Sequence, residues 1–290
     1  MKENQTIKNE NENENKSFIY KSSKYFMSTY EVIKKLDAYE KRYEINHKKT
    51  GEIFFCVHIS KLKIKNIENF KRIINMLINS EHPNIIKILE IYESKRSFYL
   101  VMEEFLGGDL SSKILENFDN KIGCSEKEAA KLLQQIISSI EYYNNNGIYI
   151  FNLEPENIYF LNSDQENDNP IKLIEYGQSK FAEDTFAKKI KYCIAPEAIE
   201  EIYTEKTNIW SAGVILYMLL SNEPPFDYSN HYRYEKEILK MKYDFPEKKW
   251  KNISNDAKDL ITHMIAPEKE RYTSKQVLEH PWFKKVSNLP

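Results

Sequence analysis

Two adjacent glycines, Gly107 and Gly108, separate two stretches of different hydrophobic periodicity, and this division constrains the fold more than any other feature. Before them, short runs of aromatic and β-branched residues such as Ile53–Ile59 are typical of strands. After them, apolar residues recur at spacings of three and four, as in amphipathic helices. The pattern predicts a small β-rich lobe, a Gly-Gly joint and a larger helical lobe.

Within the first stretch one main helix is expected, at about Ile67 to Asn79, because apolar residues fall on one face there. Strands are expected at Tyr30–Ile33, Arg42–Ile45, Ile53–Ile59, Ile85–Ile91 and Ser97–Glu103.

In the second stretch, Ser125 and Glu128 form a capping-box pattern at the start of a long helix that ends at Gly147. Residues 208–221 are nearly all apolar, which indicates a buried helix. By contrast, residues 1–17 are mainly Asn, Glu and Lys and are expected to be disordered, since they cannot bury enough surface to offset chain entropy.

Charge and cysteine content exclude several classes of function. The 290 residues carry a formal charge of -2, so there is no bias toward nucleic acid or anionic lipid. The longest wholly apolar run, Val214–Leu220, is too short to span a membrane. The first residues contain no apolar stretch typical of a signal peptide. Three widely spaced cysteines suit a reducing compartment, so we expect a cytoplasmic protein.

A series of short motifs resembles the protein kinase domain over roughly residues 30–285, nearest to the calcium-dependent and calmodulin-dependent serine/threonine kinases. The matching motifs are Thr50–Glu52, His82–Ile85, Tyr99–Glu103, Gly107–Leu110, Pro155–Asn157, Ile171–Gly177, Ala195–Glu197, Trp210–Gly213, Arg271 and His280–Phe283.

The resemblance implies an α+β, bilobal protein-kinase-like fold with a β-rich N-lobe at 30–105 and a mainly helical C-lobe at 106–288. A leading segment, 18–29, and the tail, 1–17, precede it. No calcium-binding Asp-x-Asp-x-Asp-Gly loop occurs in the sequence.

The parts that grip phosphate in the family differ here. The phosphate-covering loop normally has three glycines, but Leu36–Ile45 has none. The family lysine that holds the α- and β-phosphates is Val57, and the helix glutamate that pairs with it is Ile73. Both halves of that ion pair are therefore apolar, which predicts a packed lobe rather than a broken pair.

The catalytic loop has also changed. The family's base aspartate is Asn152, whose amide cannot accept a substrate proton at neutral pH. The lysine that steadies the transferred phosphate is Glu154, which reverses the charge. The resemblance assigns the two magnesium positions to Asn157 and Glu175, so weak magnesium binding is possible there.

The adenine pocket is expected to be filled. In the family a small alanine lies above the base and a leucine below it; here these positions are Phe55 and Tyr159. The two added rings would occupy much of the volume of the base. Met102 holds a further family nucleotide position.

Other positions favour retention of the fold. Glu197 and Arg271 match the family's buried ion pair, and Asn208 replaces an aspartate that bonds the catalytic-loop backbone. Four apolar or aromatic residues match the column that links the lobes, namely Leu77, Ile88, Ile150 and Tyr176. In the activation segment the usual threonine is Ile190, and Thr185 lacks the usual arginine partner because that position is Phe151.

These differences favour a catalytically impaired pseudokinase that acts as a signalling scaffold, with no cofactor predicted. Its partner would be a protein, such as an active kinase or its substrate, and neither nucleic acid nor membrane. The alternative is an atypical active serine/threonine kinase using ATP and magnesium, with Lys41 or Arg42 as a relocated cation, although we expect both residues to be solvated.

A third interpretation is a domain that allosterically activates a true kinase. Two aromatic-rich segments are candidate docking surfaces, Ser17–Tyr30 and Phe226–Tyr243. Packing of the same rings onto the chain's own surface explains them equally well.

Overall fold

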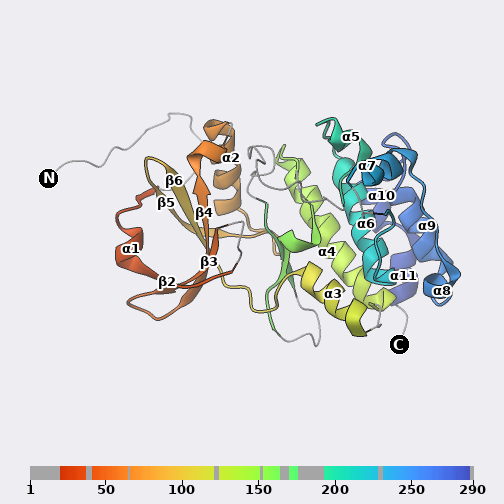
Figure 1. The fold of residues 1–290 in the computed structure, drawn as a ribbon, viewed down its shortest axis with the longest axis horizontal. Helices are drawn as coiled ribbons and strands as arrows, with labels where there is room; N and C mark the ends of the chain where they lie inside the picture. Colours follow the sequence, from red (N-terminus) through yellow and green to blue (C-terminus); the bar gives the residue numbers. More distant parts are fainter. Residues whose placement is uncertain are drawn as a thin grey trace.

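The structure, a computed structural model, describes residues 20–36, 41–64, 66–120, 124–150, 153–163, 170–175, 193–227 and 231–287. It consists of a sheet-rich lobe and a helical lobe side by side (Figure 1). The predicted α+β architecture is confirmed. None of the helices in the described part of the chain is long and apolar enough to cross a membrane. The tail, 1–17, lies outside the described residues.

A six-stranded sheet forms the N-lobe, in the order β1-β5-β6-β4-β3-β2. Neighbouring strands in the sheet are antiparallel, except that β1 runs parallel to β5. The strands are β1 (Lys21–Ser22), β2 (Tyr30–Lys35), β3 (Arg42–His47), β4 (Ile53–Ser60), β5 (Ile88–Glu93) and β6 (Ser97–Met102), and β4 leads into a short 3-10 turn, η1 (Lys61–Lys63). Strand β5 begins three residues later than expected because Ile85 bridges to Leu173 in the C-lobe instead.

The main N-lobe helix, α2 (Ile67–Ile78), matches the predicted helix closely. The Asn66 side chain caps it by accepting a hydrogen bond from the Asn69 amide at 2.9 Å. The apolar face predicted from the spacing is buried against the sheet beside β5, and its members are Phe70, Ile73, Ile74 and Leu77.

The leading segment belongs to the same sheet. Besides β1, it supplies the short helix α1 (Phe26–Thr29), whose Phe26 is only 3% exposed and stacks on Tyr99 with ring centroids 4.6 Å apart. Because side chains alternate along a strand, Cys56 lies under α1 while its neighbours Phe55 and Val57 join the main core. The leading segment therefore covers the sheet face opposite α2.

Gly107 and Gly108 make the joint between the lobes. A Cβ on Gly107 would lie 2.2 Å from the Asn162 carbonyl oxygen, and Gly108 has a φ of +71°, so both positions require glycine. The C-lobe follows as α3 (Leu110–Asn120), α4 (Glu126–Asn145), η2 (Pro155–Asn157), β7 (Ile158–Phe160), β8 (Ile171–Leu173), α5 (Pro196–Ile199), α6 (Thr207–Ser221), α7 (His231–Lys240), α8 (Glu247–Trp250), α9 (Asn255–Met264), α10 (Ser274–Leu278) and α11 (Pro281–Ser287).

Helix α4 is fixed at its start by polar contacts. The Ser125 side chain accepts from the Glu128 amide at 3.2 Å, as the capping pattern predicts, and the Glu128 carboxylate pairs with Lys113. The Glu126 carboxylate accepts from the Ser254 amide at 2.7 Å and from the Trp282 indole at 2.6 Å. This one carboxylate therefore ties α4 to the start of α9 and to α11.

The buried helix expected at 208–221 is α6, and every residue from Thr207 to Ser221 is buried. Phe226 stacks on its Trp210 with ring centroids 5.8 Å apart, and Tyr243 packs against Phe226. In the leading segment, Tyr20 contacts Phe98, whereas Tyr25 is 65% exposed. Most of the described aromatic residues in the two candidate docking segments thus pack onto the chain itself. Phe18 lies outside the described residues.

Candidate functional site between the lobes

The residues at the family's nucleotide positions come together where the two lobes meet. Phe55 and Val57 are on β4, Met102 ends β6, and Ile73 is on α2. From the C-lobe, Asn157 ends η2 and Tyr159 lies on β7. All are buried except Tyr159, which is half-buried and packs against the same core. At the two N-lobe positions where the sequence predicts loss of the family's lysine–glutamate pair, Val57 and Ile73, the side chains are apolar and buried.

A cation nevertheless enters this cleft, from β3. Arg42 lies opposite Val57 in the β3–β4 register. Its Nη1 donates to the Tyr159 hydroxyl at 2.6 Å, and its Nη2 donates to Asn157 Oδ1 at 3.1 Å. The guanidinium carbon also lies 5.9 Å from the centre of the Tyr159 ring.

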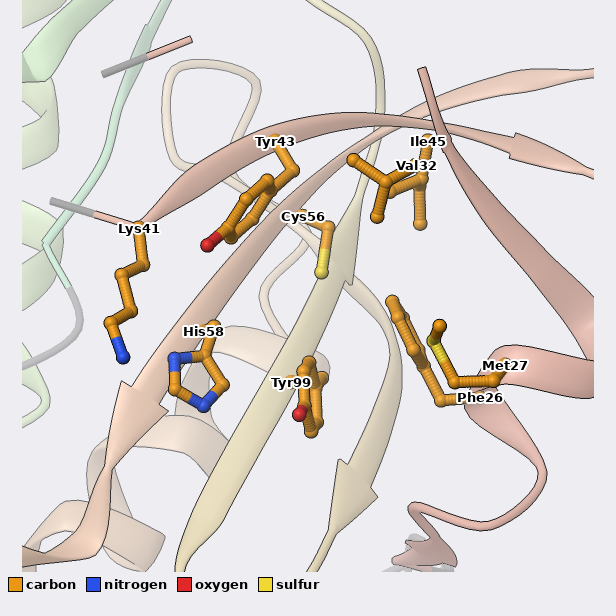
Figure 2. Close-up of a pocket in the computed structure, with 9 residues that line it drawn as sticks. All are labelled: Phe26, Met27, Val32, Lys41, Tyr43, Ile45, Cys56, His58 and Tyr99. Carbon is orange, nitrogen blue, oxygen red and sulfur yellow. The ribbon is translucent and has the colours of Figure 1, made fainter. Parts of the chain in front are cut away.

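The expectation that Arg42 is solvated is wrong, since the residue is only 6% exposed. Strand alternation explains the error. Neighbouring residues point to opposite faces of a sheet, so Arg42 enters the cleft while Lys41, just before β3, lies exposed on the outer face (Figure 2). Only the expectation for Lys41 agrees with the structure.

Three aromatic rings meet at the position of the family's adenine. The Phe55 and Tyr159 ring centroids are 5.9 Å apart, and Phe105 lies 5.3 Å from the first and 5.2 Å from the second. A planar base between two rings needs about 3.5 Å on each side, or about 7 Å in all. The residues present therefore do not fit the base in this arrangement. The contribution of Phe105 was not predicted, because no family motif includes that position.

The residues at the family's two magnesium positions are Asn157 and Glu175. Asn157 Oδ1, the ligand atom, already accepts a hydrogen bond from the Arg42 guanidinium, and a positive charge beside it opposes a second cation. Glu175 is buried, and its backbone carbonyl accepts from the Tyr143 hydroxyl at 3.2 Å. Among the described residues no three His, Cys, Asp or Glu side chains form a metal-binding group. The donor set therefore fits a magnesium ion poorly.

Glu154 occupies the family's phosphate-steadying position, but it is buried and points to a different partner. Its Oε1 accepts from the Cys193 amide at 3.2 Å. Burial, followed by the negative charge of Glu154, raises the pKa of the Cys193 thiol. Ser211 on α6 donates to the Cys193 carbonyl at 2.7 Å. These contacts anchor the chain just before α5, a structural role that the motif comparison did not reveal.

The three structural positions lie in the C-lobe core. Arg271 donates from Nη1 and Nη2 to the two carboxylate oxygens of Glu197, at 2.6 and 3.1 Å. Asn208 is buried on α6, and within the described part of the chain its Nδ2 has no hydrogen-bond partner. Leu77, Ile88 and Ile150 of the interlobe column are buried.

Several predicted positions lie outside the described residues. They are the base position Asn152 with its neighbour Phe151, the column residue Tyr176, and the activation-segment residues Thr185 and Ile190.

The chain has a sheet-rich lobe with one main helix, a glycine joint and a larger helical lobe, and the cleft lies between the two lobes. This arrangement defines the protein kinase fold class. The family model for the protein kinase domain matches residues 38–283. The chain therefore belongs to the protein kinase family.

Curated relatives carry the same assignment. Calcium-dependent protein kinase 5 of Plasmodium falciparum (isolate 3D7) is 40% identical over 247 residues, covering 83% of this chain and 42% of that protein. Calcium-dependent protein kinase 14 of Arabidopsis thaliana is 37% identical over 248 residues, covering 82% of this chain and 46% of that protein. A probable myosin light chain kinase of Dictyostelium discoideum is 36% identical over 247 residues, covering 81% of this chain and 61% of that protein.

The chain thus spans less than half the length of these two calcium-dependent relatives. By family it belongs with the serine/threonine protein kinases, whose usual cofactors are ATP and magnesium.

Proposed function

We propose that this chain is a catalytically impaired protein kinase that acts as a signalling scaffold or allosteric partner of another protein. The observation that carries the proposal is the contact of Arg42 with Tyr159 and Asn157, which closes the cleft with the chain's own side chains. A buried guanidinium that already has two acceptors is not available to grip phosphates without breaking those bonds.

The neighbouring positions support the same reading. Val57 and Ile73 pack as apolar residues, so no lysine is held in place by a helix glutamate. Glu154 would repel a phosphate rather than steady it. Removal of one member of a catalytic unit already costs several powers of ten in rate, so these combined changes are expected to abolish phosphotransfer.

We further propose that the cleft is closed to ATP and magnesium. The ring cluster of Phe55, Phe105 and Tyr159 opposes the base, and Arg42 opposes the metal. The partner would then be a protein, an active kinase or its substrate. A cytoplasmic location is consistent with three cysteines that are free and buried.

A thermal melt with and without millimolar ATP and magnesium tests the proposal. Ligand at about 100 times its dissociation constant would stabilise the domain by roughly 2.7 kcal/mol, which at about 2–4 °C per kcal/mol is a rise of about 5–11 °C in melting temperature. We expect no shift, and no incorporation from radiolabelled ATP into a generic protein substrate. A clear shift accompanied by incorporation would refute the proposal.

One observation favours the alternative of an atypical active kinase. Arg42 brings a cation into the cleft opposite the missing lysine, where it could contact phosphates after a change of side-chain conformation. In that case phosphotransfer would be measurable and would be lost in Arg42→Ala but kept in Lys41→Ala, because Lys41 lies on the outer face. Equal activity in both variants would remove the support for this alternative.

A further inference from the structure

The outer face of the N-lobe sheet contains a cavity of about 240 Å³ that is separate from the cleft (Figure 2). Its floor is apolar and includes Ile45 on β3 and Cys56 on β4, both buried. Phe26 of α1 forms one wall, and the rings of Tyr43 and Tyr99 form others. The cavity exists because α1 covers only part of this face and leaves the region over β3 and β4 open.

The charge of the cavity is one-sided. Among the described residues, Lys41 is the only one in the lining with a full charge at neutral pH, and none of the described lining residues is a carboxylate. Lys41 is exposed and forms no ion pair with the described residues. His58 is neutral at that pH, because burial and the nearby Lys41 ammonium lower the pKa of its imidazole. The cavity is therefore an apolar space with one positive end.

The polar groups gather at that end. Figure 2 shows the side chains of Lys41, Tyr43 and His58 on one side of the cavity, and Phe26 with Met27 on the other. His58 Nε2 lies 2.9 Å from the Ser97 hydroxyl, so one ring nitrogen has a partner. The other, Nδ1, is buried without a hydrogen-bond partner among the described residues. A ligand carboxylate at this end would pair with the exposed Lys41 ammonium.

We propose that this cavity binds a small carboxylate with an aromatic body, with the carboxylate at Lys41 and the ring over Ile45 and Cys56. The volume sets the size of the ligand. An apolar cavity of about 150 Å³ accommodates benzene, so 240 Å³ holds a ring plus a short acid chain. The aromatic walls favour an aromatic body, since ring pairs add to the burial of apolar area. A ligand of this size is expected to bind with a dissociation constant from tens of micromolar to millimolar.

Methionine methyl NMR locates such binding directly. The chain has seven methionines, so ¹³C-methyl labelling gives a small spectrum. Met27 lines the cavity, whereas Met102 is buried in the cleft at the end of β6. Titration with 3-phenylpropionate should shift the Met27 signal and leave that of Met102 in place. The Met27 signal is assigned by its loss in Met27→Leu.

A pair of probes matched in shape but different in charge, together with a pair of variants, tests the role of Lys41. The neutral isostere 3-phenylpropionamide should bind at least about fivefold more weakly than the acid, and Lys41→Gln should remove that difference. Lys34→Gln, an exposed lysine on β2 outside the cavity, is the matched control and should behave as the wild type.

The proposal is overturned if Met27 does not respond to the acid up to 10 mM, on the order of the weakest affinity expected for this size. It is equally overturned if the amide binds as tightly as the acid, or if Met102 shifts in place of Met27. None of these outcomes depends on whether the cleft binds nucleotide, because the cavity lies on the opposite face of the sheet.

Discussion

Arg42 on β3 donates from Nη2 to Asn157 Oδ1 in the C-lobe, at 3.1 Å, and so links the two lobes through the floor of the cleft. The same guanidinium donates to the Tyr159 hydroxyl at 2.6 Å. In the family arrangement a metal ion and phosphates provide the charged bridge between lobes. Here one side chain provides a positive charge and two hydrogen bonds at that place, so the closed form is held by the protein alone.

Replacing Arg42 with methionine should therefore destabilise the fold. The substitution keeps an apolar stem but leaves the Tyr159 hydroxyl and the Asn157 amide without this donor. We expect a loss of about 1–3 kcal/mol in the free energy of unfolding, measured by urea denaturation. Lys41→Met, next in the chain but exposed, should change it by less than about 0.5 kcal/mol. Equal effects of the two substitutions would show that the Arg42 contacts do not contribute to the free energy of unfolding.

The ring cluster predicts how nucleotide binding could be restored. The double substitution Phe55→Ala and Tyr159→Leu restores the family's small roof and aliphatic floor and removes two of the three rings. It should create an ATP-dependent rise in melting temperature larger than that of the wild type. The pair His58→Ala and Tyr99→Leu, on the outer face, is the matched control. If the opened variant shows no larger ATP response than the wild type, the ring cluster is not what limits nucleotide binding.

The contacts of Glu154 predict that restoring the family's lysine at this position would destabilise the fold. Restoring the family lysine, Glu154→Lys, would bury a cation against the Cys193 amide, which is itself a donor. We expect a loss of about 3 kcal/mol or more in the free energy of unfolding, because a buried cation would lie against a donor and the Cys193 amide would lose its acceptor. Glu154→Gln keeps an oxygen acceptor and should cost less. A lysine variant as stable as the wild type would contradict the anchoring role.

The Glu197–Arg271 pair predicts a pH dependence. Burial alone would raise the pKa of Glu197, but the hydrogen bonds and charge of Arg271 outweigh it and hold the pKa below its ordinary value of 4.5. A depressed pKa gives a stability contribution that is complete above that ordinary value and is lost as the pH falls through the lower, folded value. The stability difference between the wild type and Glu197→Gln should therefore be constant near neutral pH and shrink below about pH 4.5. A difference independent of pH would show that Glu197 is not ionised in the fold.

The sequence alone was sufficient to predict the two lobes and most of the helices and strands that have a buried apolar face. Apolar spacing identified α2, and a nearly all-apolar run identified α6, each within one residue of its boundaries, because the local pattern is enough to fix their burial. Motif order located the residues of the cleft, and the structure brings Phe55, Val57 and Tyr159 together as that order implied.

What the sequence did not reveal depends on contacts between distant segments. The direction of Arg42 follows from the strand register, and its partners lie 115 and 117 residues away. Phe105 joins the ring cluster through the fold of the joint, and Glu154 finds Cys193 across the C-lobe. None of these pairs leaves a local signal in spacing or propensity.

The leading segment makes the last prediction. Phe26 stacks on Tyr99 and covers the buried cluster of Ile45, Cys56 and Val101, a sheet face that α2 does not reach. Phe26→Ala should cost about 3–5 kcal/mol in the free energy of unfolding, because it removes a buried ring from a close-packed cluster. Tyr25→Ala, an exposed neighbour, should cost less than about 0.5 kcal/mol. If the segment were instead a free docking arm, both substitutions would leave stability unchanged, and urea denaturation of the two variants decides between these accounts.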